Sequence, residues 1–254
     1  MDDNREQKAP LVNGSARLRA AVTGMVALAG SEETALLAAV VSSGPEQGDP
    51  RRWAARPLVA HNTEFKRQQV HRLEAIRRGE TPPEFPQIDH SSQEVYRAYS
   101  EQSDEAVLEG ARATTLALIE QVERTCDADL VDASRHAWLA GRQLWLQIVV
   151  RGFWHPTGHL CDYYLAHGQA HNALALGSRG DAFSDLLSLP DQARGMAKYN
   201  LACAQARSGL PAIALETLEE ALRRNPDLAD NARRDPDLDL LRRQGHLEGL
   251  LGGK

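Results

Sequence analysis

Apolar residues recur at intervals of three and four along most of the chain, and this helical period constrains the fold more than any other feature. Near the N-terminus, for example, Leu18, Val22, Met25 and Ala29 share one helical face. The strict alternation of apolar and polar residues that marks a half-buried strand is missing throughout the sequence. We therefore predict an all-α protein.

Glycine, proline and capping residues divide this pattern into separate helices. The first should begin after Ser15 and stop before Ser31, whose hydroxyl, followed by two glutamates, is suited to cap a short second helix. A proline-rich loop at 81–86 should end the next helix at Gly79. The longer helices are predicted, in order, at 53–78, 92–126 and 141–175.

The four main helical segments each carry a single apolar stripe, so each stripe must be covered by the other three helices. This favours a four-helix bundle over residues 15–176, preceded by a polar, flexible tail at 1–14. The glycine-containing stretch GSRGD follows and should break the helix. We expect residues 177–254 to form a second helical module.

The second module contains the segments MAKYNLACAQARSG and PAIALETLEEALRRNP, which together resemble one tetratricopeptide (TPR) repeat. The residues that match the repeat spacing are Asn200, Leu201, Ala202, Gly209, Ala214, Leu218, Ala221 and Pro226. A lone repeat cannot bury its own hydrophobic face, so we expect this hairpin to pack on the bundle or on a partner protein. The closing segment DPDLDLLRRQGHLEGLL is predicted to be a capping helix.

Composition excludes several classes of partner. A formal charge of −6 disfavours nucleic acid, and no apolar stretch approaches the length needed to cross a membrane. The N-terminus lacks the apolar region of a secretory signal, so we expect a cytoplasmic protein. The three cysteines are odd in number and widely spaced, which predicts neither a disulfide framework nor a zinc ribbon. Lysine at only four positions, with arginine and alanine frequent, fits a GC-rich bacterial genome.

Three histidines are placed where helical geometry turns them inward. His61 lies on the apolar stripe of its helix, and His155 and His159 are four residues apart on one face of another. Three neutral imidazoles from two helices leave a coordination position open on a divalent metal such as Zn or Ni. Asp162 shares that face as a fourth ligand, an orienting partner or a general base. A lone histidine on an apolar stripe is more often a core residue than a ligand, and that alternative stays open here.

The remaining histidines and cysteines are assigned no chemistry. His71 falls on the opposite face of its helix from His61, and His167 and His171 are predicted to lie on a solvated face. Cys161 is two residues from His159 and therefore on another side of the helix, so a nucleophilic role has no support. No catalytic residue is assigned.

Two long runs resemble a known family. They read WAARPLVAHNTEFKRQQVHRLEAIRRGETPPEFP and HAWLAGRQLWLQIVVRGFWHPTGHLCDYYLAHG, and they resemble the second and fourth helices of DinB-like four-helix-bundle proteins, nearest the ClbS/DfsB branch. The resemblance covers roughly residues 15–176. It implies that His61, His155 and His159 hold a metal that activates a small thiol or water. One departure is Pro156, which removes an intrahelical donor between two of these histidines.

Two classes of function follow as hypotheses. The first is a bacterial metal-dependent transferase or hydrolase that uses a low-molecular-weight thiol or water to detoxify an electrophilic small molecule. The second is a non-catalytic interaction protein whose TPR-like module binds a peptide or partner protein. A metal-free resistance protein of the ClbS type is a further alternative, and the hairpin could also serve as a lid or as a homodimer surface. The sequence contains no phosphate-binding glycine loop, GxSxG elbow or CxxC pair.

Overall fold

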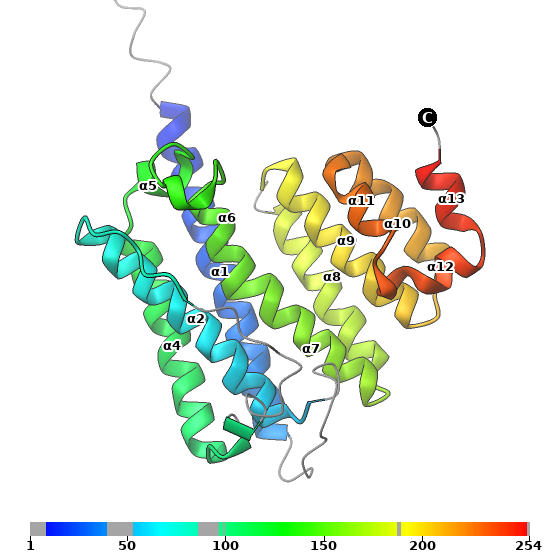
Figure 1. The fold of residues 1–254 in the computed structure, drawn as a ribbon, viewed down its shortest axis with the longest axis horizontal. Helices are drawn as coiled ribbons and strands as arrows, with labels where there is room; N and C mark the ends of the chain where they lie inside the picture. The colour runs from blue at the N-terminus through cyan, green and yellow to red at the C-terminus, as the bar shows by residue number, and fades with distance from the viewer. Residues whose placement is uncertain (1–8, 40–52, 86–96, 99, 187–188, 253–254) are drawn as a thin grey trace, which may run out of the picture. The chain divides into compact units, whose positions relative to one another are not determined.

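The computed structural model describes residues 9–39, 53–85, 97–98, 100–186 and 189–252, with side chains from residue 16 onward. Helices make up this part of the chain and no strand occurs in it, which confirms the all-α prediction (Figure 1). Among these described helices, none combines the length and the apolar character needed to span a bilayer. The chain forms two compact units, residues 1–159 and 160–254, whereas the boundary was expected near 176.

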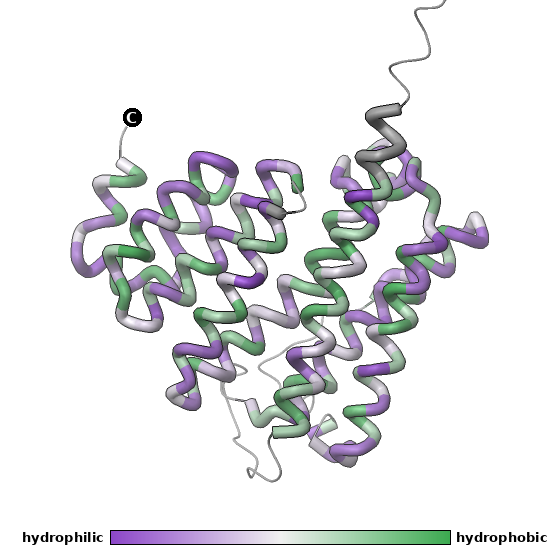
Figure 2. The backbone as a smooth tube through the Cα atoms, turned by 180° about the vertical axis from the view of Figure 1, so that it is seen from behind, coloured by the Kyte–Doolittle hydropathy of each residue, from purple (hydrophilic) through white to green (hydrophobic). Residues whose placement is uncertain are grey.

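The described part of the first unit contains three long helices and several shorter ones. Its elements are α1 (Ala9–Ala39), α2 (Ala55–Arg77), α4 (Asp104–Arg124), α5 (Asp127–Val131), η2 (Ala137–Leu139), α6 (Leu144–Val149) and η3 (Val150–Trp154). α7 (His155–Ala166) follows without interruption and contains the boundary between the two units. α1 packs against α4 and α2, and α2 packs against α4 and η3. Purple and green alternate along the helices in Figure 2, as expected when each helix buries one face.

α1 is a single helix, so the predicted cap at Ser31 is wrong. Ser31 lies inside α1, where its hydroxyl donates to the Leu28 carbonyl oxygen at 2.8 Å. Gly30 lies within this helix and allows α4 to pack closely on α1, because a Cβ at Gly30 would lie 2.5 Å from Thr115 Cγ2. α1 also begins at Ala9, within the region expected to be a flexible tail. The stretch SSGPEQGDPRR at 42–52, whose composition predicts a loop, lies outside the described residues.

The boundaries of α2 and α4 follow local capping signals. α2 matches the predicted helix within two residues and ends before Gly79, whose φ of +72° suits a residue without a side chain. α4 begins at Asp104, later than predicted, because Ser103 caps it by accepting a hydrogen bond from the Ala106 amide at 3.2 Å. Residues 86–96 lie outside the description, including the predicted start of this helix and the end of the proline-rich loop.

The segment that leads into α7 contains a π-helical turn. This turn, η3, directly precedes Pro156, which has no amide proton to donate and whose ring crowds the carbonyl four residues earlier. A wider turn accommodates both effects without interrupting the helix. Gly152 in this turn allows close packing, since a Cβ there would lie 2.8 Å from Val26 and 3.0 Å from Leu118.

The second unit begins its own helices earlier than expected. α7 ends at Ala166, Gly168 has a φ of +71°, and α8 (Ala170–Leu186) then starts, so the prediction of one helix reaching Ala175 is wrong. The stretch GSRGD, predicted to be a break, lies inside α8. Its first glycine, Gly177, instead permits close packing on α9, because a Cβ there would lie 3.1 Å from Leu201.

Both helices predicted for the C-terminal hairpin are present. α9 (Asp191–Arg207) and α10 (Pro211–Arg224) pack against each other, and α8 packs on α9. Gly209, with φ at +76°, makes the turn between α9 and α10. Small buried residues such as Ala202, Ala214 and Ala221 allow the two helices to approach closely.

The prediction of a single capping helix is wrong, because the C-terminal segment folds as several short helices. These are η4 (Pro226–Leu228), α11 (Ala229–Ala232), η5 (Pro236–Leu238), α12 (Asp239–Arg243) and α13 (His246–Leu251). Gly245, at φ +73°, turns the chain between α12 and α13. The pieces bury Leu238, Leu241 and Leu247 in the same core as α9 and α10. The hairpin therefore covers its hydrophobic face within its own unit, while its docking on the bundle remains a prediction.

Gly195→Ala should reduce the free energy of unfolding by about 1–3 kcal/mol, as expected for an overpacked core. A Cβ at Gly195 would lie 2.6 Å from Asn225 Cβ and 2.9 Å from the Ala221 carbonyl oxygen, and backbone atoms cannot move aside cheaply. Urea unfolding measures the effect. Gly110→Ala in α4 is the control: a Cβ there meets nothing within 4 Å, so stability should rise by about 0.5–1 kcal/mol. Equal effects of the two substitutions would contradict this packing.

Candidate metal centre

His61, His155 and His159 come together in the first unit. Each offers a ring nitrogen, and these nitrogens all lie within 4.8 Å of one another. His61 comes from α2 and is 1% exposed, while the other two come from α7 and are half-buried. The distances between ring centroids are 5.0, 5.0 and 4.5 Å. The three residues singled out from the sequence thus form one cluster.

The separation within the cluster is suited to a shared cation. His61 Nε2 and His155 Nε2 are 3.0 Å apart, so at least one of the two nitrogens must present a lone pair. Two imidazole nitrogens bound to one divalent ion would lie about 3–3.4 Å apart, given metal–nitrogen distances of about 2.1 Å. The donor set, three imidazoles and no carboxylate, therefore fits a borderline-soft metal.

Helical spacing and aromatic neighbours orient the three rings. His155 and His159 are one turn apart on α7, and Phe65 lies one turn from His61 on α2. Phe65 stacks on His155 with centroids 4.1 Å apart and contacts His61 at 4.7 Å. Trp53 meets His61 edge-on at 5.7 Å. These apolar walls hold the rings in place and limit the access of water.

Pro156 lies between His155 and His159 in sequence, and both histidines still belong to the cluster. Pro156 follows η3 within one continuous helical segment, so its missing amide proton removes one hydrogen bond to the preceding turn. The π turn before α7 accommodates the proline ring. Both histidines consequently remain in the cluster, in spite of the proline between them.

Asp162 does not join the cluster. Its carboxylate accepts a hydrogen bond from Arg207 and forms an ion pair with it in the second unit. Helical periodicity could not reveal a guanidinium that lies 45 positions away in sequence. None of the three roles considered for Asp162 at the metal is supported by this contact.

The other histidines considered from the sequence, His71, His167 and His171, do not form a second site. His71 is exposed, as predicted, with its ring 6.2 Å from that of Phe85. His171 is exposed on α8. His167 is half-buried, stacks on Tyr163 and has its Nδ1 2.8 Å from the Tyr163 carbonyl oxygen. The turn at Gly168 places His167 and His171 on different sides of a helix boundary, so their spacing does not create a pair.

A second group of metal-binding residue types lies in the second unit. Cys203, Asp235 and Asp237 bring potential ligand atoms within 4.8 Å of one another. Burial and the nearby Asp235 carboxylate raise the pKa of the Cys203 thiol well above its usual range, which disfavours the thiolate that a metal requires. Asp235 instead accepts a hydrogen bond from the Tyr199 hydroxyl at 2.7 Å. This group is best described as a buried hydrogen-bonded network.

Thiol reagents should modify Cys126 alone in the native protein at mildly alkaline pH. Cys126 is exposed, whereas burial, together with the Asp162 charge, raises the pKa of Cys161 to about 12. The Cys203 thiol is buried and protonated for the same reason. Mass spectrometry after iodoacetamide treatment should show one label per chain, three labels in urea, and none in native Cys126→Ser. Rapid native labelling at Cys161 would contradict these thiol environments.

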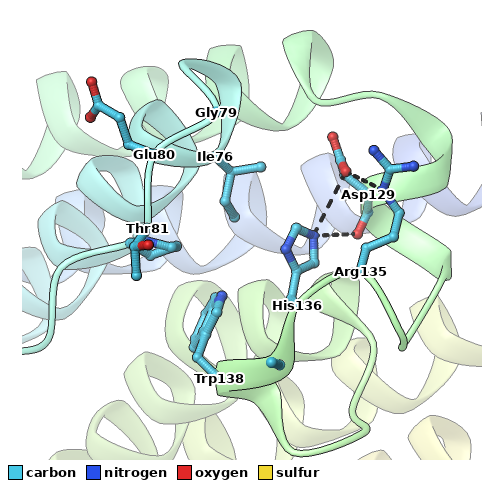
Figure 3. A pocket seen from close by; sticks show the side chains of 10 residues that line it. Ile76, Gly79, Glu80, Thr81, Asp129, Arg135, His136 and Trp138 are labelled. Atoms are coloured by element: carbon cyan, nitrogen blue, oxygen red, sulfur yellow. Dashed lines mark hydrogen bonds and ion pairs between the residues drawn. The ribbon is translucent and has the colours of Figure 1, made fainter.

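A cavity of about 470 Å³ lies at the C-terminal end of α2 (Figure 3). His136 and Trp138 line one side of it, and Ile76 and the turn that follows α2 line the other. The His136 Nε2 lies 3.1 Å from the Asp129 carbonyl oxygen, and Arg135 Nε donates to the Asp129 carboxylate at 2.6 Å. No sequence motif marked this cavity, because its walls come from segments more than 45 residues apart.

Two arginines of the first unit lie against aromatic rings, and sequence reasoning missed both. The Arg72 guanidinium carbon is 4.9 Å from the Phe85 ring centroid and 5.7 Å from that of Trp138. The Arg151 guanidinium carbon is 4.7 Å from the centroid of Phe65. A signal was present in the spacing, since Arg151 precedes His155 by one helical turn.

Comparisons with known proteins do not assign a family. No family model matches the sequence, and comparisons with curated proteins and with solved structures also find no match.

Proposed function

We propose that this chain is a metal-dependent enzyme in which His61, His155 and His159 hold a divalent ion such as Zn or Ni. The observation that carries the proposal is the convergence of three imidazole nitrogens within 4.8 Å, from two helices about 90 residues apart. When bound, such an ion lowers the pKa of a small thiol or a water molecule and so supplies a nucleophile at neutral pH. Three protein ligands leave at least one position for it.

The protein's own residues would orient and shield the reacting groups. Phe65 and Trp53 hold the imidazoles and exclude water, which strengthens electrostatic interactions inside the site. The substrate class that fits is an electrophilic small molecule, with the reaction a thiol transfer or a hydrolysis. We further propose that α1, α2, α4 and the α6–α7 segment form a DinB-like four-helix bundle, in line with the packing of α1 on α2, α4, α6 and η3 and of α2 on α4 and η3.

A second candidate is an interaction protein that uses the α9–α10 hairpin as a TPR-like module. The observation that favours it is the exposure of apolar residues where α10 begins: Ile213 is 51% and Leu210 36% exposed. An apolar edge of this kind suits a peptide, a partner protein or a second copy of the chain. In this reading the bundle would be inert, and a metal-free resistance protein of the ClbS type is a separate alternative.

The test is the metal content of the protein purified without a histidine tag. Elemental mass spectrometry should find close to one Zn or Ni per wild-type chain, and much less in His61→Ala and His159→Ala. His171→Ala is the matched control, because this exposed histidine lies outside the cluster, and it should retain the metal. Loaded wild type should then consume a small thiol with an electrophile, such as glutathione with an alkyl halide, faster than His159→Ala.

Three outcomes decide between the candidates. Metal that is lost in the cluster variants, together with the thiol or hydrolytic reaction, supports the enzyme. Bound metal without either reaction in a broad screen of electrophiles would remove the catalytic role and favour the interaction protein. Absence of metal after incubation with Zn or Ni would overturn the three-histidine site itself.

A further inference from the structure

Arg72 and Arg151 are two shielded positive charges of the first unit. Arg72 is only 8% exposed and Arg151 is half-buried, and neither forms an ion pair or a hydrogen bond with any residue that the structure describes. Arg72 Nη1 is buried without a hydrogen-bond partner. Arg72 lies over the rings of Phe85 and Trp138, and Arg151 lies over the ring of Phe65.

Shielded arginines elsewhere in the chain are treated differently. Arg207 pairs with the carboxylates of Asp162 and Asp237, and Arg224 pairs with Asp191 and Glu220. The side chains of Arg207 and Arg224 are 22% and 15% exposed, so they are less buried than Arg72. The fold therefore pairs these two partly exposed arginines with carboxylates, whereas the more buried Arg72 has no carboxylate partner among the described residues.

The two arginines also act on each other. Burial, and then the charge of Arg151, lower the pKa of Arg72, which indicates that the two guanidinium groups are near enough to repel. Burial lowers the pKa of Arg151 as well. Burying like charges costs free energy that aromatic contacts offset only in part, whereas an anion between the guanidinium groups would offset both the burial and the repulsion.

We infer that Arg72 and Arg151 bind the carboxylate of a small organic acid. Each guanidinium group lies over an aromatic ring, and the N–H groups of an arginine match the two oxygens of a planar carboxylate as hydrogen-bond donors. Phe65, Phe85 and Trp138 offer apolar contact to an organic body. A singly charged carboxylate is also less costly to dehydrate in these surroundings than a phosphate dianion.

The arginines connect this anion site to the histidine cluster. Arg151 lies over the ring of Phe65, and the same ring stacks on His155 at 4.1 Å. An acid held by Arg151 would thus have its carboxylate one aromatic ring away from the metal ligands. Here the inference rests on the proposed function and deepens it: the substrate or the thiol carries a carboxylate. Binding of the anion itself does not require the metal.

The experiment measures anion binding to the full-length, metal-free protein after chelator treatment. Isothermal titration and thermal unfolding would compare sodium benzoate and sodium succinate with inorganic phosphate, at constant ionic strength set by sodium chloride. Arg151→Gln and Arg72→Gln remove one charge each. Arg112→Gln is the matched control, because Arg112 is exposed on α4 and carries the same charge.

Benzoate or succinate should raise the Tm of the wild type and of Arg112→Gln, and Arg151→Gln should lose affinity by at least tenfold. Without ligand, Arg151→Gln should unfold at the same or a higher temperature than the wild type, because one of two repelling charges is gone. A purely structural arginine would instead lower the Tm and leave anion affinity unchanged, and that result would overturn the inference.

Two further outcomes are decisive. Tighter binding of phosphate than of either carboxylate would overturn the ligand class, and absence of binding by any of the three anions would overturn the site. His61→Ala separates the two proposals, because it should lose metal and keep carboxylate binding. Retention of carboxylate binding in a protein that never binds metal would leave the anion site standing while the proposed metal chemistry fails.

Discussion

Zinc at about a thousand times its dissociation constant should raise the free energy of unfolding of the wild-type protein by about 4 kcal/mol, because only the folded state brings the three imidazoles together. His61 and His155 come from helices about 90 residues apart, so an unfolded chain cannot hold the same geometry. The stabilisation follows from mass action and does not depend on turnover. It is the largest effect that we expect from a ligand.

His61→Ala should lose most of this stabilisation, since two neighbouring histidines on one helix bind a divalent ion far more weakly than three. Urea unfolding followed by the helical circular dichroism signal measures the difference, with and without zinc. His171→Ala is the control and should be stabilised like the wild type. Equal zinc stabilisation of His61→Ala and the wild type would show that the ion binds elsewhere, for instance at exposed histidines.

Lys66→Met should lower the free energy of unfolding by about 3–5 kcal/mol, the usual cost of leaving one member of a buried ion pair without the other. Lys66 on α2 and Glu33 on α1 are both fully buried and form an ion pair. The Lys66 ammonium also donates to Thr115 Oγ1 of α4 at 3.1 Å. The Lys66 ammonium group thus links α1, α2 and α4. Its removal leaves the Glu33 carboxylate buried without its ion-pair partner.

The double variant Glu33→Leu with Lys66→Met should recover much of that loss, because apolar side chains of similar volume can replace a buried pair at little cost. Arg67→Met is the comparison at the surface, where the Arg67–Glu64 pair is partly exposed and should contribute less than about 1 kcal/mol. Urea unfolding of the four proteins gives the comparison. A Lys66→Met protein as stable as the wild type would contradict a structural role for this ion pair.

The candidate site was accessible to sequence reasoning only in part. His155 and His159 share a face because they are one helical turn apart, and His61 lies on an apolar stripe. Local periodicity was therefore sufficient to identify all three as candidate ligands. Asp162 satisfied the same rule, yet it pairs with Arg207. Arg72 and Arg151 went unnoticed because nothing in a linear pattern shows that a charged residue lacks a partner.

The errors in the helix boundaries have a common physical origin. Ser31 and the glycines of GSRGD are ordinary signals for a helix end, but both occur inside continuous helices. At Gly30 and Gly177 the absent side chain admits Thr115 and Leu201 from a neighbouring helix. A glycine that ends a helix and a glycine that allows close packing look alike until the neighbouring helix is known.

The sequence by itself determined the all-α class, the extent of α2, the two helices of the C-terminal hairpin and the spacing of His155 and His159. Each of these depends on interactions within a few helical turns, which capping residues, prolines and the 3.6-residue period encode directly. Only the tertiary structure decided that His61 meets His155, that Lys66 pairs with Glu33, and that the Arg72 guanidinium group lies against the rings of Phe85 and Trp138. Those outcomes depend on which side chains, distant in sequence, come into contact in the interior. The packing of whole helices determines these contacts, and local spacing does not.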